Sequence, residues 1–157
     1  MALPTEDVQS YPRPPALEQV DGELTVVLGG EVVARTTRGW RVCETHHAPT
    51  YYFPPDDVVQ GALTAAGGGT VCEWKGPAAY WDVTAGGDTR TRAAWSYPEP
   101  TPGFAPIAGY LAFYPGQMEA CFVGDEQATP QPGDFYGGWV TSNLRGVVKG
   151  GPGTRHW

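Results

Sequence analysis

Short runs of alternating hydrophobic and polar residues, separated by glycines and prolines, follow one another along most of the chain. This alternation has the period of a half-buried β-strand rather than that of a helix. Three pairs of runs predict β-hairpins: residues 24–28 with 31–37, residues 70–75 with 79–84, and residues 109–114 with 118–123. The turns between them are Gly29-Gly30, Gly76-Pro77 and Pro115-Gly116, dipeptides that favour tight reversals. The pattern therefore predicts an assembly of antiparallel sheets.

The remaining segments add shorter elements. Trp40 to Thr45 continues as a strand, and the aromatic run Thr50 to Phe53 is a second, short one bounded by prolines. Pro55 followed by two acids is typical of a helix start and predicts one short helix from Asp56 to Leu63. Gly67 to Gly69 indicates a loop, and residues 89–97 fit either a strand or a helix.

Glycine and proline content sets the fold class. With 22 Gly and 16 Pro in 157 residues, few stretches can complete three uninterrupted helical turns. We therefore expect a mostly β fold, with packed antiparallel sheets and at most one or two short helices.

The length matches a single domain, residues 1–157, with a strap at each end. Residues 1–20 contain Tyr11-Pro12-Arg13-Pro14-Pro15, in which each proline favours an extended chain, so we expect an extended N-terminal strap. Residues 130–157 form a Gly/Pro-rich C-terminal strap. Its aromatic residues are expected to dock it on the domain: Phe135, Tyr136, Trp139 and Trp157.

Charge and cysteine content narrow the partners and the compartment. The net charge of −7 repels phosphate backbones and anionic membranes, so broad electrostatic binding of nucleic acid is not expected. Cys43, Cys72 and Cys121 lie far apart and form no C-x-x-C pair, which argues against a disulfide framework and a thiolate zinc site. No stretch approaches the roughly 20 apolar residues of a membrane span, and the polar start lacks a signal core. We expect a cytoplasmic protein without a membrane partner.

Strand parity divides the predicted central hairpin into two faces. The core faces carry Cys72, Trp74, Trp81 and Val83, and the opposite faces carry Glu73, Lys75, Tyr80 and Asp82. The same alternation separates two residues, Leu111 and Phe113, from Tyr110, Ala112 and Tyr114. Two faces that carry tyrosines and polar groups would form a pocket where they meet.

Lys75 carries the clearest candidate chemistry. A lysine beside Trp74, Tyr80 and Trp81 is expected to be partly desolvated, which favours a neutral amine or an anionic partner. The alternative is a surface lysine paired with Glu73, its same-face neighbour.

A second candidate group comprises Glu44, His46 and His47. Carboxylate and imidazole both bind hard or borderline divalent ions, and strand parity places Glu44 and His46 on one face. The alternative is a solvated loop entrance before Pro49.

Three segments resemble a prokaryotic family known as domain of unknown function 427: TYYFP at residues 50–54, CEWKGPAAYW at 72–81 and GYLAFYP at 109–115. The likeness extends from residues 11–15 through residues 137–139. It implies a fold similar to the β-tent, two antiparallel sheets at a steep angle with a site in the cleft between them. Many β-tent proteins pin their sheets with zinc held by two C-x-x-C pairs. This sequence has neither pair, so we expect no structural zinc and a core that holds the sheets together.

Three functions fit these observations, and the sequence leaves open whether the protein is an enzyme and which residues would be catalytic. The first is a small anionic or aromatic ligand bound in a cleft, without a cofactor; its binding residues would be Tyr52, Glu73, Lys75, Tyr80 and Tyr114. The second is a metal-dependent phosphoester hydrolase acting on nucleotides or nucleic acid, with a divalent ion on Glu44 and His46. The third is a protein-interaction module that uses the proline-rich residues 98–106.

Overall fold

The structure, a computed structural model, describes residues 3–12, 15–72, 75–132, 137–146 and 148, and only the backbone of residues 68–72. Its strands are β1 (Glu6–Asp7), β2 (Ala16–Gln19), β3 (Leu24–Leu28), β4 (Glu31–Thr36), β5 (Trp40–Cys43), β6 (Thr50–Tyr52), β7 (Leu63–Cys72), β8 (Gly76–Ala85), β9 (Asp88–Ser96), β10 (Leu111–Phe113), β11 (Ala120–Val123), β12 (Glu126–Gln127), β13 (Thr129–Pro130), β14 (Trp139–Val140) and β15 (Leu144–Arg145). The helices of the described residues are short 3₁₀ helices: η1 (Val8–Ser10), η2 (Pro55–Asp57), η3 (Pro102–Ile107) and η4 (Pro115–Gln117). No helix in this described part has the length and hydrophobicity of a membrane span.

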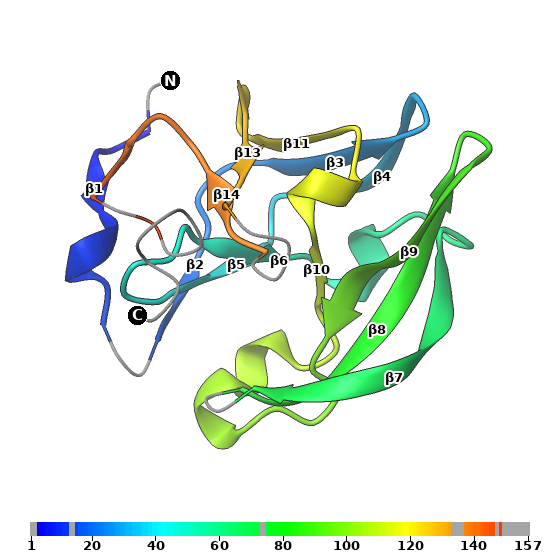
Figure 1. The fold of residues 1–157 in the computed structure, drawn as a ribbon, viewed down its shortest axis with the longest axis horizontal. Helices are drawn as coiled ribbons and strands as arrows, with labels where there is room; N and C mark the ends of the chain where they lie inside the picture. The colour runs from blue at the N-terminus through cyan, green and yellow to red at the C-terminus, as the bar shows by residue number, and fades with distance from the viewer. Residues whose placement is uncertain (1–2, 13–14, 73–74, 133–136, 147, 149–157) are drawn as a thin grey trace.

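Two four-stranded antiparallel sheets form the body of the fold (Figure 1). One has the strand order β10-β9-β8-β7 and the other β12-β11-β3-β4. A three-stranded antiparallel sheet, β2-β5-β6, lies beside them, and the short pairs β13-β14 and β1-β15 complete the fold. In Figure 1 the strands β3 and β4 cross the direction of β7, β8 and β9 at a steep angle. The prediction of a mostly β fold with packed antiparallel sheets is confirmed, and among the described pairs of named strands only β1-β15 is parallel.

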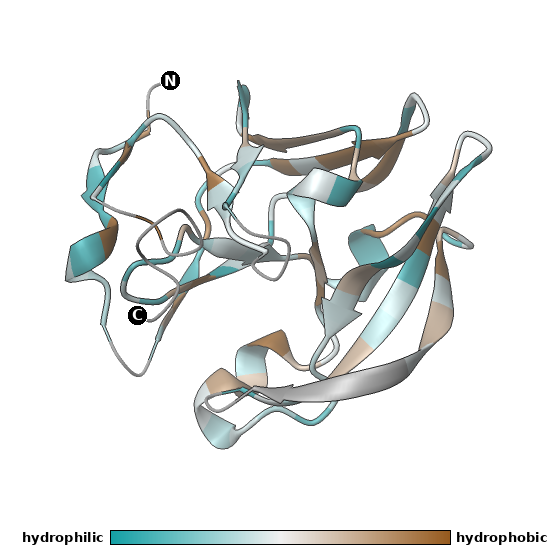
Figure 2. Ribbon diagram, in the orientation of Figure 1, coloured by the Kyte–Doolittle hydropathy of each residue, from teal (hydrophilic) through white to brown (hydrophobic). Residues whose placement is uncertain are grey.

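The main core lies between the two four-stranded sheets. Figure 2 shows the brown of hydrophobic residues along β3, β4 and β11. Alternate residues of β3, Leu24, Val26 and Leu28, are fully buried there, and Val83 and Phe113 meet them from the other sheet. Burying each such side chain contributes roughly 1.5–3 kcal/mol, so this interface contributes strongly to holding the two sheets together.

One backbone joint links the three-stranded sheet to its neighbour. Phe53 directly follows β6, and its amide and carbonyl both bond to Leu111 of β10, each at 2.8 Å. The ring of Phe53 also meets the ring of Phe113 edge to face, with centroids 5.5 Å apart. The predicted aromatic strand over residues 50–53 is therefore confirmed as β6 and the adjoining Phe53, which bridges to the edge strand β10.

Two of the three predicted hairpin pairings are present in the structure. The pair β3-β4 is confirmed, with Gly29-Gly30 as its turn. The second pairing, β7 with β8, is confirmed but its turn is displaced: Gly76 is already the first residue of β8 and faces Cys72, so Lys75 lies in the turn and not on a strand. Gly76 has φ +100°, a conformation that glycine adopts without strain, and it begins the strand where a turn was predicted.

The third predicted hairpin is wrong. β10 pairs with β9, and β11 pairs with β3 of the other sheet. Between them the 3₁₀ helix η4 (Pro115–Gln117) carries the chain from one sheet to the other, so Pro115-Gly116 is a crossover rather than a hairpin turn. A proline at the first helical position suits this geometry, because its fixed φ matches the turn and its missing N–H is not needed there.

Two further local predictions are wrong. The helix expected from Asp56 to Leu63 is only the 3₁₀ turn η2 (Pro55–Asp57), because Val59 donates instead to the carbonyl of Val33 on β4, at 2.8 Å. Gly67 to Gly69, expected as a loop, lies within β7, where the register with β8 shifts between Ala65 and Gly69. Residues 89–97, whose pattern fits either a strand or a helix, form a strand as far as Ser96, because β9 spans Asp88–Ser96.

The two predicted straps meet each other. β1 pairs with β15, and Trp139 of β14 is fully buried in the main core against Tyr51, with ring centroids 5.1 Å apart. The docking predicted for Trp139 is therefore observed, whereas Phe135, Tyr136 and Trp157 lie outside the described residues. Part of the N-terminal strap is a true sheet strand, because β2 pairs with β5 along its whole length.

Candidate functional site

A second hydrophobic cluster lies on the other face of the β10-β9-β8-β7 sheet, and we call it the aromatic cluster. Its members are Val42, Tyr52, Trp95, Tyr97, Phe104, Ile107 and Ala112, with Leu17, Trp40, Ala78, Tyr80, Tyr110 and Tyr114 packed against them. They come from β2, β5 and β6 on one side, from the sheet on the other, and from η3 (Figure 1).

The alternation of side chains along β8, β9 and β10 determines which of their residues belong to this cluster. In the register of the sheet, Trp95 lies opposite both Tyr80 and Ala112, so these three residues share one face. Their chain neighbours Trp81 and Phe113 belong to the main core on the other face. The predicted division of β8 and β10 into a core face and a tyrosine face is therefore confirmed for the described side chains.

Lys75 closes one end of the aromatic cluster. The residue is only 8% exposed, although it lies in the turn before β8. Its Nζ lies over two rings, 5.7 Å from the centroid of Tyr97 and 5.8 Å from that of Phe104. The backbone holds η3 in place, because Thr101 donates to the carbonyl of Lys75 at 3.1 Å. Among the described residues no carboxylate forms an ion pair with this ammonium.

Two tyrosines in contact with each other, Tyr80 and Tyr114, lie further along the same face. The hydroxyls of Tyr80 and Tyr114 are hydrogen-bonded, and the ring of Tyr114 lies 4.4 Å from that of Trp95. Burial, together with the neighbouring Tyr80, raises the pKa of Tyr114 to about 12, and the charge of Arg92 acts in the opposite direction. The guanidinium carbon of Arg92 lies 4.3 Å from the centroid of the Tyr80 ring. The Tyr114 phenol is therefore neutral at pH 7 and acts as a hydrogen-bonding group rather than as a base.

Four of the five predicted ligand-binding residues gather at this cluster. Tyr52 is fully buried, with its ring 6.4 Å from that of Tyr97, and Lys75, Tyr80 and Tyr114 lie around the same group of rings. Glu73, the fifth, and Trp74, predicted to turn into the core, lie outside the described residues.

The two rings beneath Lys75 and the arginine on Tyr80 are not among the residues predicted from the sequence. Tyr97 continues the alternation of β9 by one step beyond Trp95, a signal that could have placed it on this face. Phe104 sits in a proline-rich segment with no periodicity, so nothing in the sequence marks its partner. Arg92 reaches Tyr80 because of an irregularity in β9, which strand parity cannot foresee.

The second candidate group does not have its predicted geometry. β5 ends at Cys43, and His46 has a left-handed φ of +64°, so strand parity does not apply to Glu44 and His46. The carboxylate of Glu44 lies 3.8 Å from Nε2 of His47 instead, and Nδ1 of His47 contacts the side-chain nitrogen of Gln131 at 3.1 Å. No group of three or more metal-ligating side chains occurs in the part of the chain that the structure describes.

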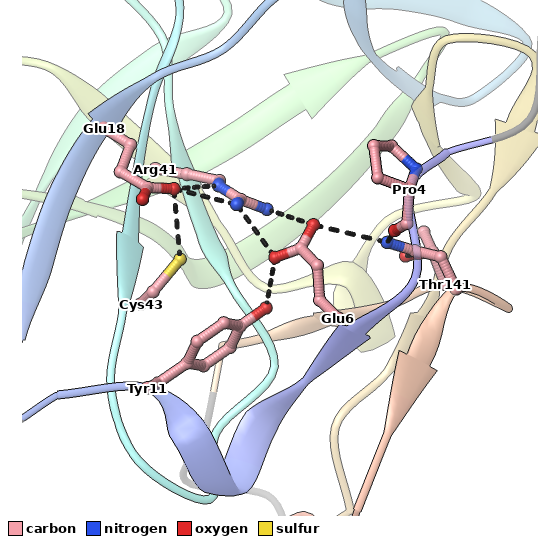
Figure 3. A network of polar contacts seen from close by, with 8 residues as sticks. Pro4, Glu6, Tyr11, Glu18, Arg41, Cys43 and Thr141 are labelled. Carbon is pink, nitrogen blue, oxygen red and sulfur yellow. Dashed lines mark hydrogen bonds and ion pairs between the residues drawn. The ribbon is translucent and has the colours of Figure 1, made fainter.

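A polar network ties the N-terminal segment to β5 (Figure 3). Arg41 binds Glu6 through both terminal nitrogens, at 2.8 and 3.0 Å, and Glu18 through Nε at 2.9 Å. The hydroxyl of Tyr11 donates to Glu6 at 2.7 Å. Burial alone would raise the pKa of Glu6, but the hydrogen bonds from Arg41 and Tyr11 and the charge of Arg41 outweigh it and lower that pKa. The network is saturated and serves as a structural clamp.

A shallow hollow of about 190 Å³ lies elsewhere, between β4, residues 59–62 and the end of β8. Its walls include Glu31, Val59 and Thr84, and none of the predicted site residues. Its lining contains no cationic side chain and no aromatic ring.

Comparison with known proteins supports the resemblance noted in the sequence. No curated protein matches the chain. A family model described as a domain of unknown function, number 427, matches residues 16–124, which include all of the described residues of the aromatic cluster and leave β1 and β12 to β15 outside. The match covers more than half of the 157 residues, and the chain belongs to the domain of unknown function 427 family.

Proposed function

We propose that this chain is a cytoplasmic domain that binds a small anionic or aromatic ligand at the aromatic cluster, with Lys75 as the group that recognises its charge. The observation that carries this proposal is the burial of Lys75, whose Nζ lies over the rings of Tyr97 and Phe104 without a carboxylate partner among the described residues. The cysteines support the compartment, because Cys43 and Cys121 are buried free thiols.

The energetics of a buried ammonium favour an anionic ligand. Removing such a group from water costs several kcal/mol, and a cation over an aromatic face recovers about 0.5–2 kcal/mol for each ring. The rings of Tyr97 and Phe104 therefore compensate only part of the cost. A carboxylate or phosphate brought to Nζ would add a charge-assisted hydrogen bond and so gain affinity from a charge that is already partly desolvated.

The chemistry of the surrounding side chains favours a flat organic anion over a bare inorganic one. Tyr80 and Tyr114 are half-buried, carry hydroxyls and belong to a cluster of aromatic rings. Aromatic side chains supply apolar area and a few polar groups supply orientation, which is the usual composition of a small-molecule site.

The metal-dependent hydrolase and the protein-interaction module stay predictions. The hydrolase has the Glu44 and His47 contact in its favour, but a divalent site needs more ligands than these two. The interaction module needs an exposed apolar patch, and the large hydrophobic side chain that is exposed among the described residues is Val59.

The test uses benzoate as the probe and benzamide as its neutral counterpart, each titrated against the full chain by ligand-observed NMR. We expect benzoate to bind more tightly than benzamide, and Lys75→Met to remove this preference while keeping the packing of the aliphatic stem. Arg90→Gln is the control, because it removes one positive charge from an ion pair with Asp88 on the same sheet. Equal affinities of the wild-type protein for the two probes, or a preference that survives in Lys75→Met, would contradict the proposal.

A further inference from the structure

Two cations at the aromatic cluster have no acidic partner among the described side chains, unlike most of the other described cations. Most described arginines form ion pairs with carboxylates: Arg35 with Glu23, Arg38 with Asp57, Arg41 with Glu6 and Glu18, and Arg90 with Asp88. Lys75 and Arg92 instead lie over aromatic rings, and Arg145 is exposed on β15. In a chain with a net charge of −7, acids are abundant, so two neighbouring cations that meet no described carboxylate are a specific feature of this cluster.

The backbone is distorted where it places Arg92. Between two paired positions β9 has three residues, Thr91 to Ala93, where β8 has only Asp82. Arg92 takes a left-handed φ of +50°, which costs an ordinary residue about 1–2 kcal/mol. The amide of Arg92 donates to Oδ1 of Asp82 at 2.8 Å, which holds the distortion in place. Distortions of this kind concentrate at functional sites.

The distortion lays the guanidinium across the face of the sheet. Its carbon lies over Tyr80, and Nη1 donates to the carbonyl of Gly67 on β7 at 2.6 Å. A guanidinium has five N–H donors, and this hydrogen bond uses one of them. Arg92 is exposed, so the remaining donors are accessible to a ligand, whereas Lys75 is the buried cation of the pair.

The register of the sheet relates the two cations. Arg92 lies over Tyr80, which is directly opposite Trp95, and Lys75 lies over Tyr97, two residues further along the same chain. Two residues of a strand span about 7 Å, so the two cations stand over neighbouring rows of aromatic side chains. An extended aromatic skeleton that carries an anionic group at each end would lie along these rows, with one anionic group directed to each cation.

We propose that the ligand of this site is a dianion with a flat aromatic centre, whose inner anionic group meets Lys75 and whose outer anionic group meets Arg92. This inference rests on the proposed function and adds the second anionic group and its partner. The planar guanidinium binds a carboxylate or phosphate through two parallel N–H groups, and its contact with Tyr80 leaves its edge available for this. A single-stranded oligonucleotide also combines flat bases with anions, but the net charge of −7 disfavours an extended polyanion.

The test compares aromatic diacids with monoacids of the same skeleton by ligand-observed NMR titration of the full chain. The diacids are terephthalate, naphthalene-2,6-dicarboxylate and biphenyl-4,4′-dicarboxylate, and the monoacids are benzoate, 2-naphthoate and biphenyl-4-carboxylate. We expect at least one diacid to bind about tenfold more tightly than its monoacid, after correction for its two equivalent ends. Arg92→Gln should reduce this ratio to about one, and Arg90→Gln, which removes a charge of the same sign two residues away, should preserve it.

A second variant guards against a folding defect in Arg92→Gln. Arg92→Gly removes the guanidinium while tolerating the left-handed backbone, so it should also reduce the ratio to about one. If a monoacid binds through Lys75 and no diacid binds more tightly than its monoacid, the proposal of a dianionic ligand is wrong and the proposed function stands. The same holds for a gain that survives in both Arg92 variants. If Lys75→Met weakens the binding of neither the monoacids nor the diacids, the proposed function and this inference are both wrong. Both are also wrong if a thymidine decamer binds the chain and none of the acids does.

Discussion

Gly86, at the tip of the β8-β9 hairpin, packs directly on the carbonyl of Gly29, at the tip of the β3-β4 hairpin. A Cβ on either glycine would overlap the backbone of the opposite hairpin, and both residues have a left-handed φ, +57° for Gly86 and +60° for Gly29. The amide of Gly86 also donates to the carboxylate of Glu31, at 3.3 Å. The two four-stranded sheets are thus joined at their hairpin tips by a contact that only glycine permits.

Gly86→Ala is therefore expected to destabilise the protein by about 2 kcal/mol or more, because it combines a left-handed alanine with a steric overlap. The matched control is Gly87→Ala, in the same turn with φ +80° but with no atom near its added Cβ. It should cost only the backbone strain, about 1 kcal/mol. Urea denaturation measures both, and equal losses would show that the contact between the hairpin tips contributes nothing to stability.

The sequence predicted the elements of this joint but not the joint itself. Gly29-Gly30 is a local signal, and it correctly placed a two-residue turn between β3 and β4. Its contact with Gly86 depends on how two sheets from distant parts of the chain pack, which no local pattern encodes. The wrong hairpin at Pro115-Gly116 has the same cause, because the choice of strand partner for β10 and β11 is settled by the main core.

Trp139 is expected to be the residue outside the family match on which the main core depends most. It is fully buried, and its indole nitrogen donates to the carbonyl of Phe113 at 3.2 Å. Trp139→Ala should cost about 3–5 kcal/mol of the free energy of unfolding, since it leaves a large cavity. Trp139→Phe should cost about 1–3 kcal/mol, since it leaves the buried carbonyl without its donor.

The half-buried Trp40 supplies the control for Trp139, measured by the same denaturation. Trp40→Phe removes an indole of the same size from the aromatic cluster and should cost less than Trp139→Phe. Comparable losses for the two substitutions would mean that the C-terminal strap adds no more to the fold than a surface-facing ring.

At the candidate site, sequence reasoning succeeded where the chain is regular. The period of two placed Tyr80 and Tyr114 on one face, because β8 and β10 keep it through these positions. It failed where the chain is irregular. Lys75 lies in a turn and is buried by Phe104 of η3, and Arg92 reaches Tyr80 only through the distortion of β9.

The thiols of Cys43 and Cys121 are expected to be unreactive in the folded protein. Burial raises the pKa of each to about 12, and at Cys43 the nearby charge of Arg41 only partly offsets it. Because the thiolate is the nucleophile, a disulfide reagent at pH 8 should label neither thiol in native Cys72→Ser and both of them in denaturant. Rapid labelling of the native variant would contradict the burial of these two residues.

The clamp between Glu6 and Arg41 is expected to make the fold sensitive to acid. The pKa of Glu6 lies below its usual value of 4.5 in the folded protein, so the ionised form is favoured by folding. Its contribution to stability is fully present above the unfolded pKa and is lost as pH falls through the folded pKa. Glu6→Gln should therefore lower stability at pH 7 and flatten its decline between about pH 5 and pH 3.

Glu23→Gln, in an exposed pair with Arg35 at 3.7 Å, should do neither, because such pairs contribute about 0–1 kcal/mol. Urea denaturation of the wild-type protein and both variants across this pH range measures the free energy of unfolding and tests the prediction. An unchanged slope in Glu6→Gln would assign the acid sensitivity elsewhere, first to Asp57, whose pKa is lowered by hydrogen bonds from Thr36 and Arg38.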